Sequence, residues 1–100
     1  MADVWTHGTW TVKPGREDDF VRAWRELARR GSTELEVVSP PTLLRDRETP
    51  NVFVSFGPWP SIEDVNRFRS SPAFREGVAA MEDLLESFEP RTLDEMGLDG

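Results

Sequence analysis

Runs in which apolar and β-branched side chains dominate occur at four places along the chain and predict four strands. Residues 4 to 12, VWTHGTWTV, end at a Lys-Pro-Gly turn signal and predict the first strand. Residues 42 to 47 and 51 to 56 are separated by Glu-Thr-Pro, which is hairpin spacing. A fourth strand is expected from about residue 88 to residue 96.

A helix is predicted between the first two strands. Residues 16 to 31 carry Glu17, Asp18 and Asp19 in the first turn and two Arg before Gly31, which is the charge order that favours a helix with a Gly stop. Their apolar stripe consists of Phe20, Trp24, Leu27 and Ala28. Residues 32 to 41 then predict a loop, in which residues 35 to 38 could pair as a short strand.

Two serines, Ser61 and Ser71, predict two further helix starts. Ser61 can cap a short helix, with Asp64 three residues later as in a capping box. Ser71 followed by Pro72 is the pairing that opens another helix. The apolar stripe expected for that last helix is Phe74, Val78, Met81, Leu85 and Phe88.

The predicted order is β-α-β-β-α-β, which is the ferredoxin-like α+β arrangement of two helices on one face of a four-stranded antiparallel sheet. One hundred residues suffice for a single domain, residues 1 to 100, with a polar tail at residues 97 to 100. Any large site must therefore lie within its core or between copies of the chain.

The two faces of the predicted sheet both carry aromatic side chains. Along the first strand Trp10 and Trp5 fall on opposite faces, and along the third strand Phe56 and Phe53 do the same. Two helices can cover only one face, and we assign Trp5 and Phe53 to the uncovered one. A second copy packing sheet against sheet would cover it, so a homodimer is expected; scattered surface aromatics are the alternative.

Composition narrows the classes of function. The net charge of −7 opposes binding to nucleic acid or to anionic membrane surfaces, and no apolar run is long enough to span a membrane. The absence of Cys agrees with a cytoplasmic location and excludes thiolate chemistry. With a single His, a transition-metal site is not expected, and no nucleotide-binding motif is present.

The chain resembles the antibiotic biosynthesis monooxygenase domains, which are dimeric α+β barrels. The resemblance rests on the segments TVKPGREDDF, VFVSFGPWPSIEDVNRF and SSPAF in their order and spacing. It implies a cofactor-independent monooxygenase that acts on a quinol, phenol or polyketide. Haem-degrading relatives use an Asn, a Trp and a His where this chain has Gly8, Phe68 and Val78, so that activity is not expected.

Oxygenation without a cofactor needs an electron-rich aromatic substrate, a dry aromatic cavity and groups that move a proton and orient the ring. We expect a cavity between sheet and helices, with Gly8 opposite Phe68 leaving room for a ring and Trp59 closing the end of the sheet. The residues expected to line the cavity are Trp10, Trp24, Phe56, Phe68, Phe74 and Met81. Each could equally serve only as core packing.

Two polar side chains are candidates for the chemistry. His7 is the natural catalytic base because its ordinary pKa of about 6.5 lies near neutrality, although strand parity would place it opposite Trp10. Arg45 could bind an anionic substrate oxygen, or be an ordinary exposed Arg. The alternatives to an oxygenase are a non-catalytic dimeric barrel that binds a small apolar ligand and a polyketide cyclase-like tailoring protein.

Overall fold

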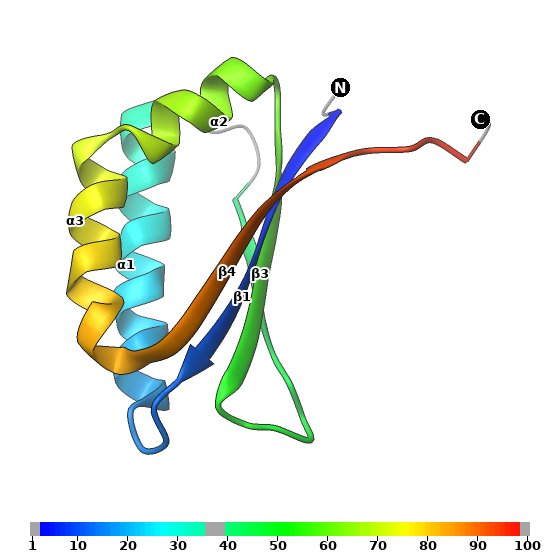
Figure 1. The fold of residues 1–100 in the computed structure, drawn as a ribbon. Coiled ribbons are helices and arrows are strands. Elements are labelled where there is room, and N and C mark those ends of the chain that lie inside the picture. Colours follow the sequence, from blue (N-terminus) through cyan, green and yellow to red (C-terminus); the bar gives the residue numbers. More distant parts are fainter. Residues whose placement is uncertain (1–2, 36–39, 99–100) are drawn as a thin grey trace.

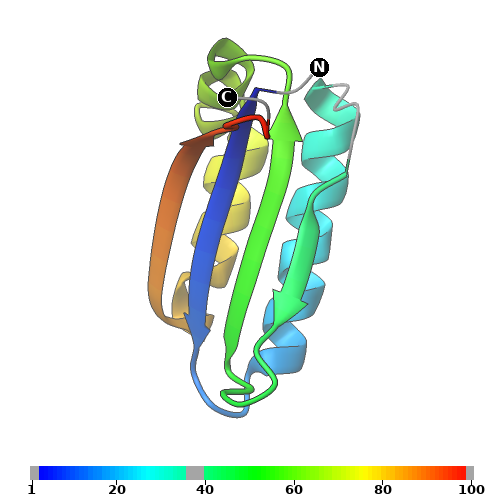
Figure 2. The ribbon, with the colours of Figure 1, turned by 90° about the vertical axis from the view of Figure 1, so that its right-hand side faces the viewer.

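Four antiparallel strands form one sheet, and the helices cover one of its faces. The computed structural model describes residues 3 to 35 and 40 to 98. The strands are β1 (Val4–Val12), β2 (Thr42–Arg45), β3 (Val52–Trp59) and β4 (Leu85–Asp94), in the order β2-β3-β1-β4. Figure 2 shows the face of the sheet that no helix covers, with the helices behind it. The predicted ferredoxin-like fold is confirmed.

The helices are α1 (Glu17–Leu35), α2 (Ile62–Arg69) and α3 (Pro72–Met81), followed by the short 3-10 helix η1 (Glu82–Leu84). α1 and α3 run side by side along the sheet, while α2 lies across one end of it (Figure 1). No helix among residues 3 to 35 and 40 to 98 is both long and apolar enough to cross a membrane.

Both predicted serine caps are present. The Ser61 hydroxyl accepts a hydrogen bond from the Asp64 amide at 3.2 Å, and the Ser71 hydroxyl accepts one from the Phe74 amide at 3.2 Å. Each cap satisfies a backbone donor that the first turn of a helix cannot pair internally. The sequence therefore divides this region into two helices, as expected.

Two predicted helix ends were wrong. α1 does not stop at Gly31 but continues to Leu35. The helix that starts after Ser71 ends at Met81, and both Leu85 and Phe88 belong to β4, where Phe88 pairs with Trp10. Leu35 is thus helical, and the rest of the short strand considered at residues 35 to 38 lies outside the described residues.

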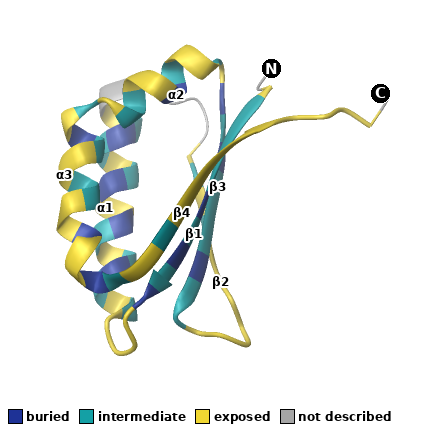
Figure 3. Ribbon diagram, in the orientation of Figure 1, coloured by how far each residue is buried: buried dark blue, intermediate teal, exposed yellow. Residues whose placement is uncertain are grey.

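The core lies between the sheet and the helices. Phe20 of α1 packs against Trp10 and Phe53, with ring centroids 5.4 and 5.0 Å away, and Phe53 is 2% exposed. Figure 3 shows the buried positions concentrated on the facing sides of these elements. Phe53 therefore belongs to the helix-covered face, and its assignment to the open face was wrong by one position of the strand alternation.

The residues on the open face of the sheet are half-buried or exposed, and several of them are large and apolar. Trp5 and Phe56 lie there with ring centroids 6.4 Å apart, and the register places Leu93 opposite Trp5 and Leu44 opposite Val54. Leu44 is 51% exposed and Leu93 is 43% exposed. This face thus carries large apolar side chains that the single chain does not cover.

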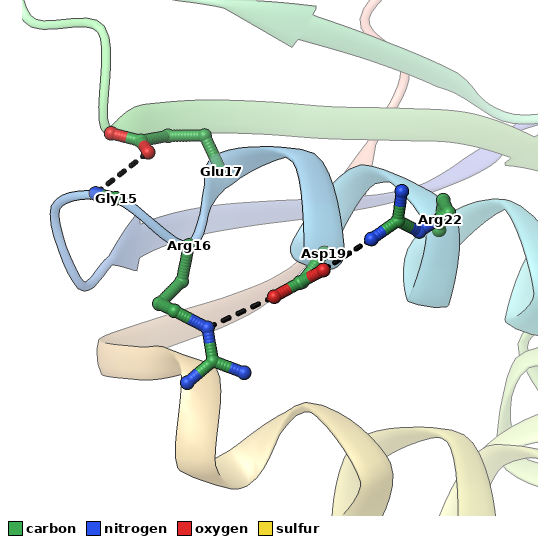
Figure 4. A network of polar contacts seen from close by, with 5 residues as sticks. All are labelled: Gly15, Arg16, Glu17, Asp19 and Arg22. Carbon is green, nitrogen blue, oxygen red and sulfur yellow. Dashed lines mark hydrogen bonds and ion pairs between the residues drawn. The ribbon is translucent and has the colours of Figure 1, made fainter.

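The start of α1 is held by a network of charged side chains (Figure 4). The Glu17 carboxylate accepts a hydrogen bond at 2.8 Å from the amide of Gly15, whose positive φ of 92° suits a turn Gly. Asp19 pairs with Arg16 at 3.0 Å and also with Arg22. The hydrogen bond from Arg16 is the main cause that lowers the pKa of Asp19 below its ordinary value.

Candidate active site

A cavity of about 110 Å³ lies between the sheet and the helices, at the end of the sheet nearest α2. β1 and β3 form its floor, and the second half of α1, α2, the start of α3 and β4 form its other walls. The lining side chains are mainly apolar or aromatic and include Trp10, Trp24, Leu27, Ala28, Trp59, Phe68, Phe74 and Phe88. A space of this kind, partly enclosed by aromatic walls, is the usual setting for a small-molecule ligand.

Phe68 is at the centre of the aromatic wall. Its ring centroid lies 5.2 Å from that of Trp59 and 5.1 Å from that of Phe74, the latter in an edge-to-face arrangement. A Cβ at Gly31 would lie 2.8 Å from Cε1 of Phe68, so α1 needs Gly at this position to admit the ring. Gly31 therefore shapes the cavity wall and does not end the helix.

Two of the hydroxyl groups that line the cavity, those of Ser55 and Thr6, each accept a hydrogen bond from an indole. Nε1 of Trp10 donates to Oγ of Ser55 at 2.9 Å, and Nε1 of Trp59 donates to Oγ1 of Thr6 at 2.9 Å. Both hydroxyl oxygens are therefore acceptors for an indole, and each hydroxyl keeps its own hydrogen for another partner. Both residues line the cavity, so they can donate to an oxygen atom of a ligand.

Trp24 offers a third donor. It lines the cavity and is 9% exposed, and its indole N–H has no hydrogen-bond partner among the described residues. No fully buried polar side-chain atom in residues 3 to 35 and 40 to 98 lacks a partner, so this N–H retains access to open space. The site thus offers N–H and O–H donors to a ligand that presents oxygen acceptors.

Gly8 lies in the cavity wall, but the space above it is filled by the chain itself. A Cβ at this position would lie 2.9 Å from Cε1 of Phe88, 3.1 Å from Oγ of Ser55 and 3.1 Å from Nε1 of Trp10. Phe88 stacks on Trp10 with ring centroids 3.8 Å apart. The ring directly above Gly8 is therefore Phe88 of the chain itself, although Gly8 and Phe68 both line the cavity as expected.

Five of the six residues expected to line the cavity do so, namely Trp10, Trp24, Phe56, Phe68 and Phe74. Phe56 borders the cavity, but its ring packs near Trp5 on the open face. Met81 is fully buried in the core and does not line the cavity. The alternation of side chains along β3 turns the Phe56 ring to the open face, and Met81 lies too deep in the core to reach the cavity.

The two chemical candidates lie away from the aromatic walls. His7 also borders the cavity, but it alternates with Thr6 and Gly8 along β1, so its imidazole belongs to the open face. Arg45 lies outside the cavity: its Nε donates to the carbonyl of Pro50 at 2.6 Å, and its guanidinium sits 5.4 Å from the ring centre of Phe53. We therefore assign neither the base nor the anion contact to these side chains.

The polar residues Thr6 and Ser55 were missed from the sequence, and Trp59 was assigned only to closing the end of the sheet. Small hydroxyl residues in a strand carry no signal of their own. Ser55 is identified only by its pairing with Gly8 and by the indole that it meets from Trp10.

A family model described as antibiotic biosynthesis monooxygenase matches residues 4–80. The chain belongs to the antibiotic biosynthesis monooxygenase family. The match includes β1, the three α-helices apart from the last residue of α3, and the strands between them, so it contains every cavity residue except those of β4. No curated protein sequence matches the chain significantly.

Solved structures agree with this family fold at low sequence identity. SnoaB, a cofactor-independent oxygenase from Streptomyces nogalater, is 22% identical over 100% of both chains, with a TM-score of 0.85. PA3566 from Pseudomonas aeruginosa is 20% identical over 97% of each chain, with a TM-score of 0.81. A conserved protein from Methanosarcina mazei Go1 is 15% identical over 96% of this chain and 95% of that one, with a TM-score of 0.84. These likenesses establish the fold.

Proposed function

We propose that this family member is a cofactor-independent monooxygenase-like protein that acts on an electron-rich aromatic compound, a quinol, a phenol or a polyketide, in the cavity between sheet and helices. The observation that carries the proposal is the combination of aromatic walls with three hydrogen-bond donors, from Thr6, Trp24 and Ser55, in one partly enclosed space. Aromatic walls hold a flat ring, and donors favour the anionic form of a phenol over the neutral form.

The chemistry requires the substrate to supply the electrons. A phenol that loses its proton becomes an anion that can transfer an electron to O2. In the overall reaction one oxygen atom enters the ring to give a quinone, and the other leaves as water with the two hydrogens that the substrate gives up. The chain's own contribution is to exclude water, orient the ring and stabilise the phenolate oxygen by hydrogen bonds.

The size of the cavity limits the part of the substrate that it can enclose. Its volume of about 110 Å³ is somewhat below the roughly 150 Å³ of an engineered protein cavity that holds benzene. One aromatic ring therefore fills it, and a larger substrate would extend through the opening. A fused polyketide would insert only its reacting ring.

The working unit proposed here is a homodimer. The open face presents Trp5, Phe56, Leu44 and Leu93, and packing the same face of a second copy against it would remove this apolar surface from water. The sheet-to-sheet arrangement leaves the cavity of each subunit on the far, helix-covered side. Each subunit would therefore carry its own site.

Oxygen consumption and ligand binding test the proposal together. Hydroquinone and naphthol should quench Trp fluorescence saturably, and the protein should raise O2 uptake above the rate of spontaneous oxidation in solution. Phe68→Ala should weaken binding by about 2-fold to 12-fold because it removes one aromatic contact. Arg29→Ala, on the exposed side of α1, is the control and should bind as the wild type does.

The outcomes separate the alternatives. Saturable binding with O2 uptake at the solution rate would overturn the oxygenase proposal and leave a ligand-binding barrel. Conversion of a polyketide chain to a ring without O2 consumption would identify a cyclase-like protein instead. Absence of binding for every aromatic probe would refute the cavity as the site.

A further inference from the structure

The wall of the cavity contains one charged residue, to which the proposed function gives no role. Arg69, the last residue of α2, lines the cavity and is half-buried. Among the lining residues that the structure describes there is no other Lys or Arg, and there is no Asp or Glu. The cavity of a chain with a net charge of −7 therefore carries a single positive charge in its wall.

The guanidinium of Arg69 is held in place by neutral oxygens. Nη1 donates to Oγ1 of Thr92 at 2.8 Å, and Nη2 makes a longer contact of 3.4 Å with the carbonyl of Arg91. Both acceptors come from β4, so they tie the guanidinium to the edge of the sheet. A guanidinium has five N–H groups, and these two contacts leave three of them available.

The charge of Arg69 is also without a carboxylate partner. In the described part of the chain, no Asp or Glu lies within ion-pair distance of it, whereas Arg67 on the same helix pairs with Asp64 at 3.0 Å. Other Arg without such a partner lie outside the cavity wall. A half-buried, immobilised and uncompensated guanidinium beside a ligand-sized space is typical of an anion-recognition group.

We infer that Arg69 binds a carboxylate carried by the aromatic substrate, so that the protein selects hydroxylated aromatic acids over neutral phenols. This inference rests on the proposed function and refines its substrate class. The ring would occupy the aromatic space beside Phe68, and the carboxylate would meet Arg69 where the cavity opens to solvent. The planar fork of a guanidinium matches a carboxylate, and the free N–H groups of Arg69 supply the donors.

A purely structural role for Arg69 predicts a different result. If its only task were to tie α2 to β4 through Thr92, its removal would loosen the cavity wall and weaken every ligand alike. Charge recognition instead weakens only ligands that carry the carboxylate. A pair of ligands that differ in charge but hardly in shape therefore separates the two roles.

The experiment uses gentisate and its uncharged amide, with binding followed by Trp fluorescence and calorimetry in the absence of O2. Wild type should bind gentisate about tenfold more tightly than the amide, the size expected for a charge-assisted hydrogen bond reduced by solvent screening. Arg69→Met should abolish that preference and leave the affinity for the amide within about twofold. Arg69→Lys should retain part of it, and Arg67→Met, on the same helix, should retain all of it.

Each remaining result counts against the inference. An equal loss for both ligands in Arg69→Met, an unchanged preference, or no binding of gentisate to wild type would overturn it. Thermal unfolding of each variant checks that the fold is intact. Binding is measured without O2 and is therefore independent of oxidation. If gentisate is preferred through Arg69 but aerobic assays show no O2 uptake, only the oxygenase proposal is refuted. Oxidation of ligands without any such preference would refute only the role of Arg69.

Discussion

Replacing Ser55 by Ala tests the polar part of the cavity most directly. The substitution removes the oxygen that accepts the 2.9 Å hydrogen bond from Nε1 of Trp10, a residue only 4% exposed. A buried donor left without a partner costs about 1 to 3 kcal/mol. The adjoining cavity of about 110 Å³ can admit a water molecule to that N–H, so we expect the lower part of this range, about 1 to 1.5 kcal/mol.

For a domain of this size the loss corresponds to a Tm lower by about 4 to 12 °C. Circular dichroism at a fixed protein concentration measures it, because the stability of an oligomer depends on concentration. Ser87→Ala is the matched control: Ser87 is an exposed residue of β4, and its loss should change stability by less than about 0.5 kcal/mol. Equal Tm values for the two variants would refute the assignment of Ser55 as the partner that Trp10 requires.

Three further predictions concern other parts of the molecule. Trp5→Glu should convert the proposed dimer to a monomer in sedimentation equilibrium, because it would bury an unpaired charge between two sheets; a wild-type monomer would contradict this. Gly77→Ala should lower Tm, because its Cβ would lie 2.7 Å from Cδ1 of Leu27 and overpacking of the core costs about 1 to 3 kcal/mol. This cost exceeds the gain of about 1 kcal/mol by which Ala favours a helix over Gly. A higher Tm would show that Leu27 moves aside freely. The pKa of Asp19 is lowered in the folded state. The stability that Asp19 contributes is therefore present above the pKa of an unfolded Asp and is lost as the pH falls through the lowered pKa. Asp19→Asn should reduce Tm near neutral pH and leave Tm unchanged in strong acid.

Local signals in the sequence identified most of the fold. The first strand was predicted with its observed bounds because its β-branched and aromatic residues end at a turn whose Gly15 needs a positive φ. The caps at Ser61 and Ser71 were equally local, since each involves an amide only three residues away. Signals of this kind need no knowledge of the rest of the chain.

The errors arose where tertiary contacts decide the outcome. Gly31 has the composition of a helix stop, but its lack of a side chain serves the approach of Phe68 from α2. Phe88 continues a helical spacing, yet its stacking on Trp10 belongs to a strand. The same limitation applies to the site, because the roles of Ser55 and Arg69 depend on contacts with residues of other elements.

The position of β4 at the edge of the sheet has a consequence for solubility. A ten-residue edge strand offers a row of unpaired backbone groups to any passing chain, and such edges seed fibrous aggregates. Here the edge carries the exposed acidic residues Glu86 and Glu89, and Pro90 lacks an amide hydrogen. These residues disfavour the addition of further strands at β4, while the open face of the sheet remains available for packing against another chain. In the proposed dimer, self-association through a face that one further copy covers would stop at two chains and would prevent open-ended polymerisation.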